Sequence, residues 1–347
     1  MAMGMLIDGR WTDDERLIKK GAFERQPSVF GDRIESRNVA AFLEMPGRFV
    51  LIASMSCPWS HRTLILRNLK GFSEYVPAQI AGGRRVQGYS VNSNTPWKLP
   101  GTSKEILHVH EIYTHSDPGY TGRASVPVLW DSFYGKIVSN DSMAIMKAFD
   151  EAVAAPGFLD FTLVPDALKK DIESLNARLY KKLANGVYRA GLAQSQKSYH
   201  SAVTDVFNML DALEERLSDL RLLFGQTLTL SDVILFPVLV RFDAVYNTHF
   251  RCTRNRLMDY PALWAYARDL YAWRGMAELV DFDVIRAGYF MNDGLHNPFG
   301  IISIRPHADW RKAHNRTAFG PPRVMLKTRQ WCEISPDTMT PAESKCP

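Results

Sequence analysis

Residues 48–69, RFVLIASMSCPWSHRTLILRNL, form the stretch that decides the fold. Its first part, 48–54, is short, apolar and rich in β-branched side chains, which predicts a buried strand. A helix is expected from Pro58 to Leu69, because proline suits the first position of a helix, where an amide proton would have no partner. The sequence therefore predicts a strand-to-helix junction with Cys57 immediately before the helix.

Cys57 is the candidate nucleophile at this junction. Free backbone amides, the positive end of the helix dipole and the nearby His61 and Arg62 all favour the thiolate over the thiol. The alternative is an inert cysteine, since free cysteine is among the most buried residue types. Ser60 occupies the place of a second redox cysteine, so an external thiol must resolve any mixed disulfide. Glutathione is the simplest such thiol.

Further strands are expected near residues 75–81, at SVPVLWD (125–131) and at KIV (136–138), before a helix over DSMAIMKAFDEA. The order strand, helix, strand, strand, helix indicates an α/β domain, which we place at 48–155.

The flanking and inserted segments lack this regularity. Residues 1–47 are polar, punctuated by Gly and Pro, and are interpreted as an irregular leader. The Gly-, Pro- and Ser-rich chain from 71 to 122 is interpreted as a long insertion with at most one strand, its inserted loop lying at about 82–122.

Beyond Pro156 the apolar period becomes helical, with leucines and other apolar residues at spacings of three and four. We expect an all-helical domain over 156–290. Within it, Thr229 opens a capping box for an apolar helix, and Pro261 opens another helix. Residues 291–347 are expected to be an extended segment ending in a loosely held polar tail, which contains Cys332 and Cys346.

Composition limits the classes of function. A chain of 347 residues with 46% hydrophobic and 23% charged residues is typical of a folded protein of about two domains. The formal charge of +5 comes from scattered basic residues, which argues against nucleic-acid binding. Four unpatterned cysteines predict neither a disulfide framework nor a metal site. With no apolar run long enough for a bilayer, we expect a cytoplasmic protein without a membrane partner.

A second pattern is suited to binding a peptide. A cis Val126-Pro127 bond would turn the backbone of Val126 outward, where it can pair with the cysteine of glutathione in the manner of a strand. One strand later, Asp141 and Ser142 begin a helix whose carboxylate, hydroxyl and amides can bind the γ-glutamyl ammonium and carboxylate. The alternative for Asp141 is a plain N-cap.

The motifs CPWSHR, YTGRASVPVLWD, KIVSNDS, NGVYRAG and LVRFDAVYNTHFRC resemble the Xi-class glutathione transferases, also called S-glutathionyl-hydroquinone reductases. The similarity runs from about Leu6 to Arg316. It implies an α/β thioredoxin-like N-terminal domain plus an all-α C-terminal helical bundle. It also implies glutathione as co-substrate, an aromatic small-molecule substrate, a homodimer, and reductive deglutathionylation of glutathionyl-hydroquinones.

The resemblance also implies roles for single residues. Cys57 would be the nucleophile, and two tyrosines would face the aromatic substrate. The tyrosines are Tyr188 and Tyr289. Trp97 would cover the bound glutathione, Arg123 would pair with one of its carboxylates, and Val126, next to Pro127, would bond to it through the backbone. Asp141 with Ser142 would hold the γ-glutamyl group. For each of these side chains the alternative is a purely structural role.

The match departs from the family at several positions. The family usually has glutamate at Asp141, a second phenol at Phe290, proline at Ala313, and Gly-Trp where this chain has Pro96-Trp97. Two other functions therefore remain open. One is a Cys-dependent transferase or lyase for another aromatic electrophile, by ether cleavage, dehalogenation or conjugation. The other is a non-catalytic carrier of hydrophobic ligands.

Overall fold

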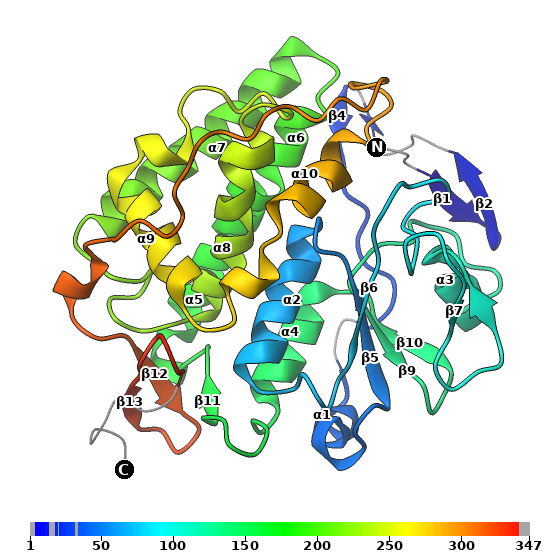
Figure 1. Ribbon diagram of the computed structural model, residues 1–347, viewed down its shortest axis with the longest axis horizontal. Helices are drawn as coiled ribbons and strands as arrows, with labels where there is room; N and C mark the ends of the chain where they lie inside the picture. The colour runs from blue at the N-terminus through cyan, green and yellow to red at the C-terminus, as the bar shows by residue number, and fades with distance from the viewer. Residues whose placement is uncertain (1–3, 14–17, 20, 32–33, 340–347) are drawn as a thin grey trace. The chain divides into compact units, whose positions relative to one another are not determined.

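The computed structural model describes residues 4–13, 18–19, 21–31 and 34–339 of the chain (Figure 1). These residues form two compact units. The first comprises the described parts of Met1–Leu17, Arg25–Pro156 and Asp281–Ser303. The second comprises those of Ile18–Glu24, Gly157–Val280 and Ile304–Pro347. The helical domain predicted over 156–290 is therefore too long at its C-terminal end, because Asp281–Ser303 belongs to the first unit.

The first unit is built on a four-stranded sheet in the order β10-β9-β5-β6. Strand β6 runs parallel to the central β5, while β9 is antiparallel to β5 and β10 is antiparallel to β9. All five residues of β5 are buried, as a strand covered on both faces requires. The strands are β5 (Phe49–Ala53), β6 (Ala78–Ile80), β9 (Val128–Asp131) and β10 (Lys136–Ser139).

Helices cover this sheet. Helix α2 (Pro58–Leu69) packs against α4 (Ser142–Glu151), and α3 (His110–Ser116) contacts β10. Figure 1 shows α2 and α4 on one side of the sheet and α3 on the other. The predicted strand-to-helix junction is confirmed, because β5 ends at Ala53 and α2 begins at Pro58.

The expectation of an irregular leader is wrong. Strand β1 (Gly4–Ile7) pairs with β2 (Arg10–Asp13), and β3 (Ile18–Lys19) pairs with β4 (Ala22–Phe23). Helix α1 (Ser36–Glu44) follows. Leu6 also exchanges two backbone hydrogen bonds of 2.9 Å with Gly122. Partners distant in sequence stabilise these segments, and a local apolar pattern of four residues does not reveal such partners.

The insertion is also more regular than expected. It contains α3 and a small hairpin of β7 (Trp97–Lys98) and β8 (Glu105–Ile106). Ile112 and Tyr113 of α3 are fully buried. This helix has seven residues, many of them poor helix formers, so tertiary packing rather than local propensity stabilises it.

The second unit is mainly helical. Helix α7 packs against α6 and α9, while the wholly buried α8 contacts α5 and α9. The capping box of Thr229 with Asp232 and the N-terminal Pro261 of α9 are both confirmed. The helices in the described part of this unit are α5 (Lys169–Arg178), α6 (Gly186–Gly191), α7 (Gln196–Leu217), α8 (Leu230–Arg241), α9 (Pro261–Ala272), two π-helices (Leu179–Ala184 and Phe242–Tyr246) and four 3-10 turns (Asp166–Leu168, Leu257–Asp259, Ala277–Leu279 and Arg316–Phe319).

The C-terminal segment is partly ordered as a sheet, which corrects the expectation of a loosely held tail. Strand β12 (Arg323–Leu326) lies between β11 (Phe161–Thr162) and β13 (Trp331–Glu333). Cys332 of β13 is buried. Cys346 lies outside the described residues. Among the described helices, none is long and apolar enough to cross a membrane.

Candidate functional site

Cys57 is the N-cap residue of α2, as the position of Pro58 predicted. Its backbone N–H donates to the carbonyl oxygen of Ser54 at 3.0 Å, which fixes the turn between β5 and α2. Cys57 is 7% exposed, and its sulfur lies 3.5 Å from the carbonyl oxygen of Val126. The sulfur is therefore at the positive end of α2 and beside the segment that precedes β9.

The Val126–Pro127 peptide bond is cis, as predicted. The backbone N–H of Val126 makes no hydrogen bond to another described residue, so it is available to an extended peptide. The Tyr113 hydroxyl contacts two nearby segments of the chain. It donates to the carbonyl of Ser125, next to Val126, at 2.8 Å, and it accepts from the side-chain amide of Asn140, next to Asp141, at 3.1 Å. One phenol from α3 thus connects the Val126 segment with the start of α4.

Asp141 is the N-cap of α4. One oxygen, Oδ1, accepts from the backbone amides of Met143 at 2.7 Å and Ala144 at 2.8 Å. Its other carboxylate oxygen makes no hydrogen bond within the described chain, so capping and binding an ammonium group are compatible. Next to it, Ser142 is buried, and its hydroxyl accepts from Nη2 of Arg62 at 2.5 Å. The arrangement can bind the charged end of an amino acid.

Tyr89 is a residue of this site that the sequence analysis missed. It packs against the core cluster that contains Cys57 and Val126, and its hydroxyl lies near Ser56. Burial raises the pKa of the Tyr89 phenol, while the Arg85 guanidinium, 4.0 Å from the ring centroid, opposes that rise. The sequence held no local signal for it, because Tyr89 lies in the inserted segment, far from Cys57 along the chain.

Helix α10 (Phe282–Phe290) packs against the turn that carries the thiol. A Cβ atom on Gly288 would lie 2.3 Å from Cβ of Ser56, so the helix comes this close only because residue 288 lacks a side chain. Asn292, just beyond the helix, accepts at 2.7 Å from the backbone amide of Arg85. The predicted Tyr289 is therefore on a helix that contacts the residue preceding Cys57, and its side chain is 4% exposed.

Of the other predicted residues, Trp97 and Arg123 belong to the first unit and Tyr188 to the second. Trp97 is partly buried on β7 against the same core cluster. Arg123 donates from Nη1 to the carbonyl of Gly4 at 3.2 Å, so it holds the first hairpin strand. Tyr188 belongs to the second unit, on α6, with its ring 5.2 Å from that of Phe250 and 6.1 Å from that of Tyr246.

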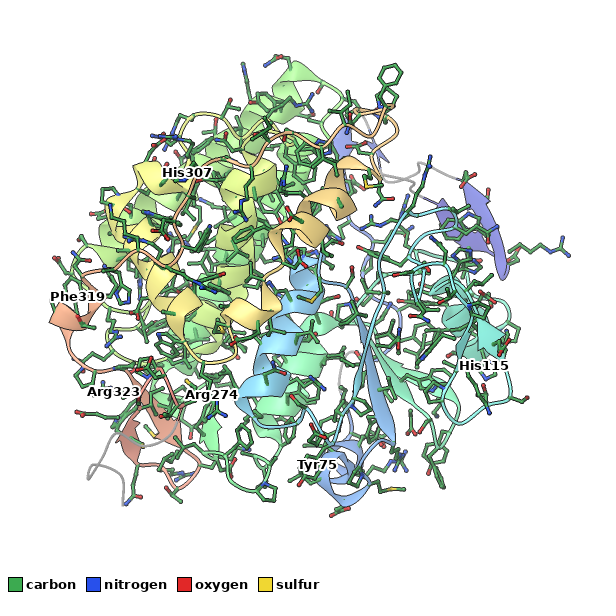
Figure 2. The ribbon with its side chains drawn as sticks, in the orientation of Figure 1. Tyr75, His115, Arg274, His307, Phe319 and Arg323 are labelled. Carbon is green, nitrogen blue, oxygen red and sulfur yellow. The ribbon has the colours of Figure 1, made fainter. Side chains whose placement is uncertain are left out.

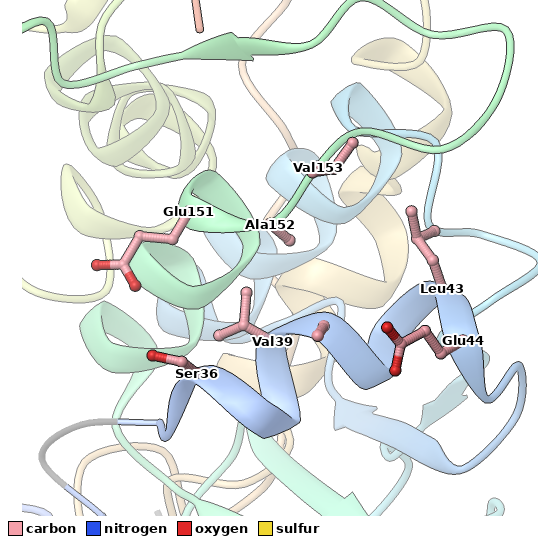
Figure 3. A pocket seen from close by; sticks show the side chains of 8 residues that line it. Ser36, Val39, Leu43, Glu44, Glu151, Ala152 and Val153 are labelled. Carbon is pink, nitrogen blue, oxygen red and sulfur yellow. The ribbon is translucent and has the colours of Figure 1, made fainter.

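A second buried cysteine, Cys252, and a groove beside α1 do not have the chemistry of this site. Burial raises the pKa of the Cys252 thiol to about 12, which keeps it protonated near neutral pH. A groove of about 440 Å³ between α1 and the end of α4 is lined by apolar residues together with Ser36, Glu44 and Glu151 (Figure 3). Within the described residues, no cluster of His, Cys, Asp and Glu could hold a metal ion.

Comparisons with known proteins identify the family of the chain. Residues 56–152 match the family described as glutathione S-transferase, N-terminal domain, and residues 187–269 match its C-terminal domain. The chain is 39% identical over 323 residues to the glutathionyl-hydroquinone reductase YqjG of Escherichia coli (strain K12), a match covering 90% of this chain and 98% of that protein. It is 36% identical over 310 residues to the glutathionyl-hydroquinone reductase PcpF of Sphingobium chlorophenolicum, covering 88% and 96%.

Solved structures give the same result. The Xi-class glutathione transferase of Natrialba magadii matches with a TM-score of 0.81 at 34% identity, covering 91% of this chain and 97% of that one. A glutathione-bound structure of YqjG matches with a TM-score of 0.73 at 40% identity, covering 78% and 89%. The chain therefore belongs to the glutathione transferase family and, within it, to the Xi class. The predicted thioredoxin-like domain and helical domain are confirmed.

Proposed function

We propose that the protein is a glutathione-dependent reductase that removes glutathione from glutathionyl-hydroquinones or related aryl adducts. The observation that carries the proposal is the placement of Cys57, with its sulfur at the N-terminus of α2 and 3.5 Å from the carbonyl of Val126. A thiol there can exchange with the sulfur of a glutathione that pairs with the Val126 backbone. The two curated relatives, both glutathionyl-hydroquinone reductases, support this chemistry.

In the first step, the thiolate of Cys57 attacks the glutathione sulfur of the adduct. A sulfur–sulfur bond forms as the bond between sulfur and ring carbon breaks, and the ring keeps the electron pair. A proton then replaces sulfur on the ring, so the hydroquinone leaves with hydrogen at that position. Tyr188 and Tyr289 are the residues that we assign to protonating or hydrogen-bonding the hydroquinone oxygens.

In the second step, the thiolate of another glutathione attacks the mixed disulfide at its glutathione sulfur. Glutathione disulfide leaves and Cys57 returns as thiolate, which the end of α2 stabilises. The net reaction consumes one adduct and one glutathione and yields one hydroquinone and one glutathione disulfide. No second cysteine of this chain is needed, in keeping with Ser60 at the position of a resolving thiol.

Glutathione binding is assigned to the residues around the thiol. The free amide and the carbonyl of Val126, next to Pro127, are suited to the cysteine backbone of glutathione, and the start of α4 at Asp141 and Ser142 is suited to its γ-glutamyl end. We assign Trp97 and Tyr89 to covering the bound peptide and Arg123 to a carboxylate. By analogy with the family, we also propose a homodimer that works in the cytoplasm, and light scattering of the purified protein tests the dimer.

Product analysis tests the reaction type. Glutathionyl-menadiol is incubated with excess glutathione and the enzyme, and the products are separated by mass spectrometry. Equal amounts of glutathione disulfide and free menadiol are expected. A new thioether, formed as one glutathione is consumed without disulfide, would instead assign the protein to conjugation. Release of neither product, with glutathione still bound, would favour a non-catalytic ligand carrier.

A further inference from the structure

A cavity of about 490 Å³ lies in the second unit, between α9, the turn that follows it, and residues 310–317. Its size is in the range that holds a single small molecule. All of its lining residues belong to the second unit. The proposed reaction at Cys57 uses none of these residues.

The charged side chains that line this cavity are mostly cationic, and the Asp309 carboxylate lies near one of them, Arg268. The described residues that line it include four cationic side chains against one carboxylate, that of Glu278. The four are Arg268, Arg274, Arg311 and Lys312. His314 adds no charge near neutral pH, because burial and the neighbouring arginines lower its pKa from 6.5. Figure 2 labels Arg274, whose Nη1 donates to the carbonyl of Thr338 at 3.3 Å.

Arg268 is the one of these four cations that is buried and held by backbone carbonyls. It is 8% exposed, and its Nη1 donates to the carbonyls of Lys312 at 3.0 Å and Ala313 at 2.7 Å. These bonds fix the segment that carries the more exposed Arg311 and Lys312 to helix α9. Its Nη2 makes no hydrogen bond to another described residue. One edge of a buried guanidinium is thus available to an anion.

Aromatic rings form another part of the wall. Trp310 and Tyr271 both line the cavity, with ring centroids 5.4 Å apart. Trp310 is held edge-on by Trp264, with centroids 4.7 Å apart and an angle of 82° between the ring planes. Because Trp264 also lies 5.1 Å beneath the Arg268 guanidinium, the ring wall and the buried cation are fixed to each other. The cavity therefore offers an apolar surface next to positive charge.

We propose that this cavity is a second ligand site, which binds a small aromatic anion. The ring of the ligand packs against Trp310 and Tyr271, and its carboxylate, sulfonate or phosphate pairs with Arg268, Arg311 and Lys312. The site is independent of the glutathione chemistry at Cys57.

Isothermal titration with 2-naphthalenesulfonate tests the proposal. One equivalent is expected to bind. Its affinity should fall at higher salt, because the charges of Arg311 and Lys312, at the rim of the cavity, are exposed to solvent. The double variant Arg311→Ala/Lys312→Ala removes two rim cations and is expected to weaken binding about tenfold. The matched control is Lys169→Ala/Lys170→Ala, an adjacent exposed pair of cations on α5 of the same unit, which leaves the affinity unchanged.

Two further measurements distinguish this cavity from other sites. The cationic analogue 1-naphthylmethylamine is expected not to bind there, and saturating S-hexylglutathione is expected to leave the sulfonate affinity unchanged. The proposal is overturned if the amine binds as well as the sulfonate, or if both double variants bind alike. Competition by S-hexylglutathione would place the sulfonate at the glutathione site instead, whereas a failure of the reductase assay would leave this test unaffected.

Discussion

The Nη2 atom of Arg62 donates a hydrogen bond of 2.5 Å to the hydroxyl oxygen of Ser142, which connects the N-terminal half of α2 with the first residue of α4. Both side chains are buried, and the Arg62 guanidinium also lies 4.7 Å from the ring centroid of Trp59. Helix α2 begins directly after Cys57, and α4 begins at the residues assigned to the γ-glutamyl group. A single arginine thus helps to set the distance between the nucleophile and the recognition site for glutathione.

Arg62→Lys keeps the positive charge but loses the planar donor geometry. We expect the KM for glutathione to rise about tenfold, with an unfolding free energy lower by about 1–3 kcal/mol from the lost buried bonds. Steady-state kinetics and thermal unfolding measure the two effects.

The matched control for this variant is Arg67→Lys, because Arg67 is buried at the other end of α2 and donates to the carbonyls of Val76 and Ser73. It should lose comparable stability with an unchanged KM for glutathione. Equal increases in KM in both variants would show that Arg62 has only a structural role.

Asp141→Asn separates capping from binding. Asparagine caps helices about as well as aspartate, so the unfolding free energy should change by less than about 0.5 kcal/mol. The lost negative charge should raise the KM for glutathione about tenfold, because a charge-assisted bond to the ammonium is removed. Asp141→Ala, which also loses the cap, should cost about 1 kcal/mol more. An unchanged KM in Asp141→Asn would mean that Asp141 is only an N-cap.

Tyr89→Phe removes the hydroxyl that lies near Ser56 and Cys57, and we expect kcat/KM to fall about tenfold, the effect of losing one hydrogen bond worth about 1.4 kcal/mol. Burial raises the pKa of this phenol above 10, so it stays protonated throughout the assay range and loses its proton only at higher pH. The ratio of wild-type to variant activity should therefore be constant from about pH 6 to pH 9. A ratio that changes steeply within this range would contradict a neutral phenol.

Gly288→Ala tests the contact between α10 and the Cys57 turn. The added Cβ would lie 2.3 Å from Cβ of Ser56, so the helix or the turn must shift. Overpacking of this kind should cost about 1–3 kcal/mol in unfolding free energy, and kcat/KM should fall with it. Gly294→Ala is the control, because a Cβ there meets no atom within 4 Å. Equal activity in the two variants would show that the contact does not position the thiol.

The sequence predicted the elements whose signals are local. The junction at Cys57, the cis bond before Pro127, the cap at Asp141 and the box at Thr229 depend on residues within a few positions of each other. Tyr89 was missed because its relation to Cys57 exists only after β5 and the inserted region fold together. The hairpin of β1 and β2 was missed for the same reason, since Leu6 pairs with Gly122.

The central claim is tested most directly by turnover of a glutathionyl-hydroquinone with excess glutathione, in wild type and in Cys57→Ser. The account predicts release of free hydroquinone and glutathione disulfide in equal amounts by the wild type. It also predicts that activity falls to the uncatalysed rate in Cys57→Ser, which should still bind glutathione. Turnover by Cys57→Ser at a rate near that of the wild type would contradict the account, because the reaction would then proceed without the mixed disulfide at residue 57.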